Sequence, residues 1–305
     1  MILVLRFAVV AAALALGGAA SAVAAPLMGW PALLGRPLPA ATERVAYGSD
    51  PLEVADLWLP DGPGPHPLVV MVHGGCWQTD VAKVTIMNYV AEDLRRHGAA
   101  VWNLEYRGVD RPGGGYPGTF TDVADGADAV RKLAASRHLD LRHVVAVGHS
   151  AGGHLVLWLA ARDGLPAASP LRRAHPLRVS VAFSLGGLPD LEAAMAPGTN
   201  TCDSDPPRRL VGEPSAARPS VFADTSPAVM SPPRAAVTLI NAERDRIAPP
   251  AFAAAYAARV GTKGPAPRTV VVPDEGHVEL ISPGSKSWDV TRGLILKSLG
   301  LPPGP

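Results

Sequence analysis

The chain has 305 residues, which is enough for one large domain or two small ones. Apolar residues make up 48% of it and charged residues 18%, so a substantial core is available and a disordered chain is excluded. The formal net charge of +1 gives no electrostatic reason to expect a nucleic acid or an acidic membrane surface as a partner.

The N-terminal residues 1–22 are typical of an export signal. Arg6 precedes an apolar run, and Ala20-Ser21-Ala22 then supplies the small-x-small pattern that signal peptidase requires. The run is short for a membrane span, which needs roughly 20 apolar residues, although an uncleaved anchor is the alternative. We therefore predict a signal peptide cleaved after Ala22, a leader segment over 23–44, and a periplasmic or secreted protein with no stable membrane insertion after cleavage.

From about Val45 onward, short strands alternate with helical stretches. The patterns predict strands over 53–60, 67–73, 99–106, 143–150, 179–185, 235–242 and 268–272, and helices over 84–98, 119–137, 152–163, 250–261 and 287–300. This alternation favours an α/β domain over 45–305, with a mostly parallel sheet and helices on both faces.

The segment 188–233 interrupts this alternation. It is rich in loops, so we predict either a lid-like insertion over the site or an ordinary surface excursion. Asp203 and Asp205 within it are typical of a solvated acidic loop rather than of a calcium site. The chain has none of the usual metal-binding spacings, so neither a metal nor another cofactor is predicted.

The strongest local signal is the pattern G-x-S-x-G in Gly148-His149-Ser150-Ala151-Gly152, between a predicted strand and a predicted helix. In that context the serine lies on a tight turn that projects its hydroxyl outward. Glycine is needed on both sides because larger side chains would collide with the turn. We predict that Ser150 is a nucleophile.

A serine nucleophile needs a base, which follows it in the chain if the order is serine, acid, histidine. His277 comes directly after the last predicted strand and is the candidate. His149 belongs to the turn itself and His154 to the following helix, so we assign both to packing or hydrogen bonding.

The third member must orient the histidine and stabilise its charged form. Asp245 lies in the loop after the strand 235–242, from which it can reach a histidine after the next strand. Glu243 and Asp274 are its rivals, and we favour Asp245, partly because of the family resemblance given below.

The strand 67–73 ends in the sequence HGGCW, which suits an oxyanion-binding loop. Glycines there let the backbone approach a substrate carbonyl, and we expect N–H donors from Gly75 or Cys76 and from Ala151. His73 would brace this loop through hydrogen bonds, and Trp77 would be a substrate-pocket wall or a packing anchor.

The two cysteines, Cys76 and Cys202, would meet oxidising conditions after export. They form either a disulfide or two separate buried side chains, and the sequence leaves both alternatives open.

These motifs, in this order, resemble the α/β-hydrolase superfamily over about residues 45 to 300. The sequences HGGCW, WNLEYRGVDRPGGGYPGTFTDV, GHSAGGHL, TSPAVMSPP and GHVELISP are similar to the small-esterase and kynurenine-formamidase-like branch. The resemblance implies a cofactor-free serine hydrolase with Ser150, Asp245 and His277 as its triad. It also implies that Tyr106 and Arg107 tie down the loop that contains them.

The predicted function is an exported serine hydrolase that cleaves small or aryl carboxylic esters through an acyl-enzyme. Its expected partner is a small-molecule ester, with no nucleic acid, and the oligomeric state is left open. An amidase of the formamidase type is the alternative within enzymes, although an export signal favours an esterase. A non-catalytic binding protein that retains the hydrolase fold is the alternative outside them.

Overall fold

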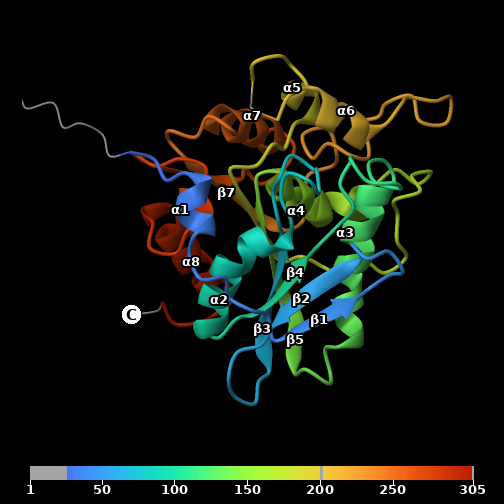
Figure 1. Ribbon diagram of the computed structural model, residues 1–305. Helices are drawn as coiled ribbons and strands as arrows, with labels where there is room; N and C mark the ends of the chain where they lie inside the picture. Colours follow the sequence, from blue (N-terminus) through green and yellow to red (C-terminus); the bar gives the residue numbers. More distant parts are fainter. Residues whose placement is uncertain (1–25, 200–201, 304–305) are drawn as a thin grey trace, which may run out of the picture.

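The computed structural model describes residues 26–199 and 202–303 (Figure 1). The predicted signal peptide over 1–22 and its cleavage site lie outside the described residues. Within the described ranges, no helix is both long and apolar enough to cross a membrane.

One sheet organises the described chain, with the strand order β1-β2-β4-β3-β5-β6-β7-β8. Its strands are β1 (Glu43–Ala46), β2 (Val54–Trp58), β3 (His66–Val72), β4 (Ala100–Leu104), β5 (Leu139–His149), β6 (Val181–Leu185), β7 (Ala236–Ala242) and β8 (Arg268–Val272). The pairings of β2 with β1 and with β4 are antiparallel, and the others are parallel. The predicted mostly parallel sheet is confirmed.

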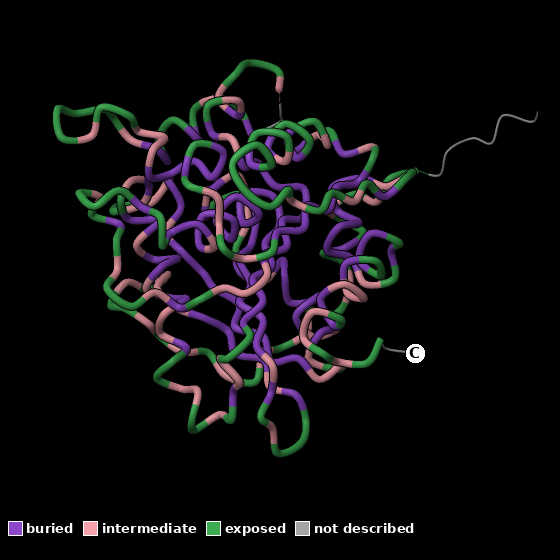
Figure 2. The backbone as a smooth tube through the Cα atoms, turned by 180° about the vertical axis from the view of Figure 1, so that it is seen from behind, coloured by how far each residue is buried: buried purple, intermediate pink, exposed green. Residues whose placement is uncertain are grey.

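Both faces of the central strands are buried. In β3, Leu68, Val70 and Val72 pack into one core, whereas Val69 and Met71 pack into the other. Figure 2 shows these central strands as buried along their length. Strands covered on both faces read as continuous apolar runs, which is why the segment around β3 predicted a strand so clearly.

Helices cover each face of the sheet (Figure 1). The longer ones are α2 (Asn88–Arg96), α3 (Gly118–Ala129), α4 (Ala151–Ala161), α7 (Pro250–Gly261) and α8 (Lys286–Ser298). Side chains of α3, α4 and α7 pack on one face, and those of α2 and α8 pack on the other. The predicted helices on both faces are confirmed, and the parallel strands bring their carboxyl ends to one edge.

The described part of the predicted leader, residues 26–44, packs against the domain. It forms the short helix α1 (Trp30–Leu34) and the start of β1. Leu33 is fully buried in the core beside α8. The backbone N–H of Met28 donates to Glu279 Oε1 at 2.6 Å, and Arg36 Nη1 donates to the carbonyl of Pro283 at 3.0 Å. This segment therefore packs as part of the same domain.

The insertion 188–233 contains the short helices α5 (Leu191–Ala194) and α6 (Asp205–Val211). The buried Asp224 anchors it, because its carboxylate accepts hydrogen bonds from Tyr116, Ser169 and Arg218 at 3.0, 2.8 and 2.9 Å. The Trp158 indole N–H also donates to the Asp224 carbonyl, at 2.9 Å. These bonds fix the later part of the insertion to α4 and to neighbouring loops.

Trp77 is a packing anchor. It is fully buried, and its indole N–H donates to His154 Nδ1 at 3.2 Å. The prediction that Trp77 lines a substrate pocket is wrong. Cys76 and Trp77 both have positive φ angles, 50° and 56°, and this turn places the indole in the core beside α4.

His154 joins three parts of the fold. While Nδ1 accepts from Trp77, Nε2 donates to the carbonyl of Thr225 at 2.8 Å, which links α4 to the insertion. The hydrogen-bonding role predicted for His154 is confirmed. Burial lowers the pKa of His154 to about 4, so the ring is neutral in the folded protein at ordinary pH.

We predict that His154 makes the folded state less stable as the pH falls from about 6.5 toward 4. An unfolded histidine has its pKa near 6.5, so in that window the unfolded chain binds a proton that the folded chain does not. The expected loss is about 3 kcal/mol, which follows from a folded pKa of about 4, and the buried His149 adds to it in the same direction.

Denaturant unfolding of His154→Gln across that pH range tests this expectation, with the exposed His143→Gln as the matched control. The His154 variant should be less stable at pH 7 but should lose less stability on acidification. An unchanged slope would contradict the expectation.

Candidate active site

Ser150 occupies a strained turn between β5 and α4, with φ 54° and ψ −120°. A left-handed conformation of this kind costs a non-glycine residue about 1–3 kcal/mol. A Cβ at Gly148 would lie 2.1 Å from the Gly152 carbonyl oxygen, and one at Gly152 would lie 2.1 Å from the carbonyl oxygen of Val72. Glycine is therefore required on both sides of Ser150, as the motif predicts.

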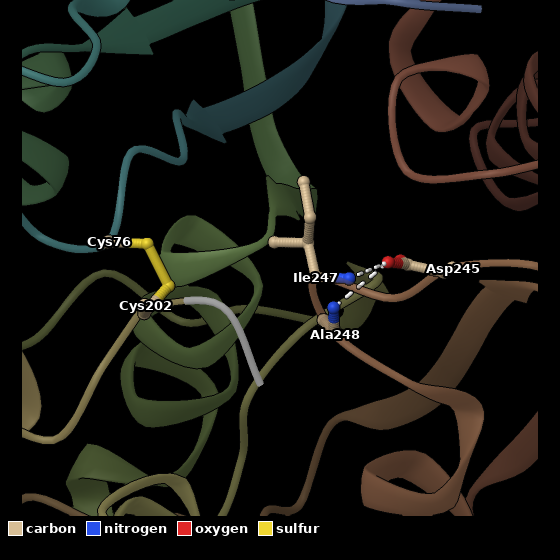
Figure 3. Close-up of a disulfide and its surroundings, with 5 residues drawn as sticks. All are labelled: Cys76, Cys202, Asp245, Ile247 and Ala248. Atoms are coloured by element: carbon tan, nitrogen blue, oxygen red, sulfur yellow. Dashed lines mark hydrogen bonds between the residues drawn. A yellow bond between two sulfur atoms is a disulfide. The ribbon is translucent and has the colours of Figure 1, made fainter. Parts of the chain in front are cut away.

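His277 and Asp245 form a buried pair after β8 and β7, which are neighbouring parallel strands. His277 Nδ1 lies 2.6 Å from Asp245 Oδ2. The other carboxylate oxygen accepts the backbone N–H groups of Ile247 and Ala248 at 2.8 and 2.9 Å (Figure 3). Since an ionised carboxylate only accepts, Nδ1 carries the proton and Nε2 keeps a lone pair.

The rivals of Asp245 lie elsewhere. Glu243 and Asp274 are both exposed, and the Glu243 carboxylate accepts the backbone N–H of Asp274 at 3.1 Å. The Glu243–Asp274 contact therefore closes a surface turn, whereas Asp245 is the acid that the structure places beside His277.

Ser150 and His277 line the same cavity, which has a volume of about 390 Å³. Apart from His149, its other lining residues lack a charged or strongly polar side chain: Trp30, Leu34, Gly75, Cys76, Val81, Ala82, Ile86 and Ile247. None of the described residues of the insertion 188–233 lines it, so the lid alternative has no support at this cavity. Helix α1 contributes to its wall instead, which the sequence analysis missed.

The loop after β3 has an unusual backbone. Gly75, Cys76 and Trp77 all have positive φ angles, of 107°, 50° and 56°. A Cβ at Gly75 would lie 2.7 Å from the Cβ of Ala82, so glycine is required there. In the described chain, the N–H groups of Gly75, Cys76 and Ala151 donate to no protein acceptor. Of these three residues, Gly75 and Cys76 line the cavity, and Ala151 directly follows Ser150.

His73 and Glu105 brace this loop through hydrogen bonds. His73 Nε2 lies 2.8 Å from Glu105 Oε1, and His73 Nδ1 lies 2.7 Å from the Gly74 carbonyl oxygen. Burial raises the pKa of the Glu105 carboxyl, but His73 and two backbone N–H groups outweigh burial and lower it overall. The Tyr106 ring stacks on His73 at 4.4 Å, and its hydroxyl donates to the His73 carbonyl. The bracing role predicted for His73 is confirmed, and the Tyr106 hydroxyl ties the segment after β4 to it, as the resemblance implied.

Arg107 ties down the segment that follows β4. Its guanidinium donates to both carboxylate oxygens of the buried Asp122 and to Glu53. The hydrogen bond to Asp122 is the main reason that the pKa of Arg107 rises above its ordinary value. Arg107 thus ties the segment after β4 to α3 and to the turn before β2.

Cys76 and Cys202 form a disulfide, with their Cα atoms 5.4 Å apart (Figure 3). Of the two alternatives for these cysteines, the bridge is confirmed. It joins positions separated by 126 residues, and it connects the loop that carries the Gly75 and Cys76 N–H groups to the insertion.

His149 supports His277. Its ring centroid lies 4.3 Å from that of His277, and Nε2 donates to the His277 carbonyl at 3.1 Å. Burial and the neighbouring His277 lower the pKa of His149 well below its ordinary value, so the ring is neutral. The packing and hydrogen-bonding role predicted for His149 is confirmed.

The acidic residues of the insertion do not form a metal site in the described chain. Asp203 and Asp205 are both exposed, and the Asp205 carboxylate lies 3.9 Å from Arg209. No group of three or more His, Cys, Asp or Glu side chains among the described residues could hold a metal ion.

Solved structures with the same fold include several esterases. A truncated carbohydrate esterase from gut microbiota has a TM-score of 0.68 and 18% identity, over 86% of this chain and 98% of its own. Esterase B from Lactobacillus rhamnosis has a TM-score of 0.70 and 17% identity, and the match covers 88% of this chain and 89% of the esterase. Thermogutta terrifontis esterase 2, phosphonylated by sarin, has a TM-score of 0.66 and 19% identity, and the match covers 91% of this chain and 100% of the esterase. No curated protein matches the chain.

The family model BD-FAE matches residues 55–259, about two thirds of the chain. This match confirms the α/β-hydrolase superfamily, and it gives no support to the kynurenine-formamidase-like branch named from the sequence motifs. The match includes Ser150 and Asp245 but ends before His277. The chain belongs to the BD-FAE family, an esterase family of the α/β-hydrolase type.

Proposed function

We propose that the protein is a serine esterase that cleaves small or aryl carboxylic esters through an acyl-enzyme. One observation carries the proposal: the strained Ser150 and the His277–Asp245 pair meet at a single cavity that Gly75 and Cys76 also line. Family membership supports ester hydrolysis in general, and the geometry supports serine as the nucleophile.

The acylation step follows from these positions. Ser150 Oγ attacks the ester carbonyl carbon while His277 Nε2 takes its proton. Asp245 accepts from Nδ1–H and stabilises the imidazolium that forms. The carbonyl oxygen becomes negative, and the N–H groups of Gly75 or Cys76 and of Ala151 stabilise it.

The cycle closes through the same groups. His277 returns the proton to the leaving alcohol oxygen as its bond to carbon breaks, which leaves the acyl group on Ser150. Water then attacks that acyl group and gives its proton to His277. The carboxylic acid leaves when the proton returns to Ser150 Oγ, so the enzyme is restored with no net change.

The cavity favours an uncharged substrate. No Lys, Arg, Asp or Glu side chain lines it in the described chain, and apolar side chains supply most of its wall. An amidase of the formamidase type would use the same triad. Comparing turnover of an aryl ester with that of its N-formyl anilide counterpart separates the two reactions, and we expect the ester to be the better substrate.

We also propose that the protein is exported, either to the periplasm or out of the cell. The Cys76–Cys202 disulfide supports it, because such bonds persist in oxidising compartments and are rare in the cytosol.

Labelling with a fluorophosphonate tests the nucleophile without requiring the true substrate. Intact-mass analysis should find one label on the wild type and none on Ser150→Ala. Labelling should persist in the matched control Ser298→Ala, whose hydroxyl bonds to a helix carbonyl in α8. Folded wild type that takes no label would favour a non-catalytic binding protein. Thermogutta terrifontis esterase 2 has been solved phosphonylated by sarin, so a protein of this fold reacts with a related reagent.

Asp245→Asn should lower kcat by about 10⁴ with a small effect on KM, because the amide favours the wrong tautomer of His277. The exposed neighbour Glu243→Gln is the matched control and should retain kcat. Steady-state kinetics on phenyl acetate measure both effects. A larger loss in the Glu243 variant would reverse the assignment of the acid.

The double variant Cys76→Ser/Cys202→Ser should lower kcat roughly tenfold or more while KM changes little. Loss of one oxyanion donor costs about 10²–10³ in kcat, and a loosened donor costs less. Thiol titration of the unfolded, unreduced wild type should find no free thiol. An unchanged kcat would show that the bridge does not position the Cys76 backbone for catalysis.

A further inference from the structure

Helix α1 forms a wall of the active-site cavity, although it lies far before Ser150 in the chain. Trp30 and Leu34 line the cavity together with Ser150 and His277. The Trp30 ring is half-buried, with its centroid 6.4 Å from that of His277 and 6.2 Å from that of His149, in edge-to-face geometry.

We propose that Trp30 and Leu34 bind the alcohol part of the ester, and that this alcohol is an apolar aryl group. This inference rests on the proposed serine-esterase function. His277 must deliver its proton to the leaving oxygen, so the alcohol departs from beside the His277 ring. Two cavity-lining side chains pack beside that ring, His149 and Trp30. His149 is buried and binds the His277 carbonyl, so the half-buried Trp30 is the one that can face the alcohol.

The chemistry of the wall selects an apolar group. Leu34 is 53% exposed and Val81 is 60% exposed, and both line the cavity. A flat aromatic alcohol would cover such surface and would pair with the indole of Trp30. A charged alcohol would lose water without gaining a partner, because no Lys, Arg, Asp or Glu side chain lines the cavity in the described chain.

One carboxylate, that of Glu279, fixes the position of helix α1 relative to His277. Glu279 Oε1 accepts the backbone N–H of Met28 at 2.6 Å, just before α1. Its other oxygen accepts the backbone N–H of Gly276, next to His277, at 3.2 Å. Because Leu33 is also fully buried, the α1 wall is formed before substrate arrives.

The test compares acetate esters of ethanol, phenol and 1-naphthol in the wild type and in Trp30→Ala. We expect kcat/KM for 1-naphthyl acetate to fall about tenfold or more in the variant, and that for ethyl acetate to fall less than about threefold. Each ester is compared with itself, so differences in intrinsic reactivity cancel. All three esters form the same acetyl-enzyme, so kcat should be unaffected wherever deacylation limits turnover.

Three further variants separate binding from folding. Trp30→Phe retains an aromatic ring and should recover most of the naphthyl preference. Leu34→Ala removes an exposed side chain and should shift the preference in the same direction by a smaller factor. Leu38→Ala, 55% exposed and outside the cavity lining, is the matched control and should behave as the wild type.

Two results would overturn the inference. An equal loss for all three alcohols in Trp30→Ala would give the indole a structural role alone. If the fall in kcat/KM in Trp30→Ala instead depends on the acyl group, being different for phenyl acetate and phenyl benzoate, the acyl part of the ester binds this wall. If the wild type neither hydrolyses any ester nor takes the fluorophosphonate label, the proposed function itself fails, which is a distinct outcome.

Discussion

The left-handed turn at Ser150 is the constraint on which the rest of the site depends. It is possible because Gly148 and Gly152 let the turn pack against backbone, including the carbonyl of Val72 at the end of β3. Ser150 N–H also donates to the Leu185 carbonyl at the end of β6. The strands on either side of β5 thus hold the turn, and the packing of the sheet maintains its strain.

The four histidines around this turn show how the environment divides one residue type into different roles. His149 and His154 are buried, burial is the main cause of their lowered pKa values, and each donates to a backbone carbonyl. His73 lies between a carboxylate and a carbonyl and braces a loop. Only His277 pairs with an acid while its ring reaches the cavity. The residue type alone does not single out the proposed catalytic base, whereas the neighbours of His277 distinguish it from the other three histidines.

Much of the fold and the core of the site could be predicted because their signals are local. The run through β3 and the motif around Ser150 each carry their physical reason within a few residues. Asp245 and His277 could be placed because parallel strands bring their loops to one edge, and the family resemblance favoured Asp245 over Glu243 in the same loop. The orientation of Trp77 could not, since it depends on two positive φ angles and on a partner in α4. Pairing of Cys76 with Cys202 likewise depends on how the insertion packs.

Helix α1 was missed for a related physical reason. With five residues it is too short to show a helical period, and only Leu33 among them is buried. Its position comes from contacts made far along the chain, chiefly the bond between Met28 and Glu279. The site is therefore bounded by distant segments, with the N-terminal helix beside His277 and the disulfide-linked insertion behind the oxyanion loop. The central sheet positions Ser150, Asp245 and His277, and in the proposed esterase these segments would set the substrate preference without disturbing the Ser150 turn.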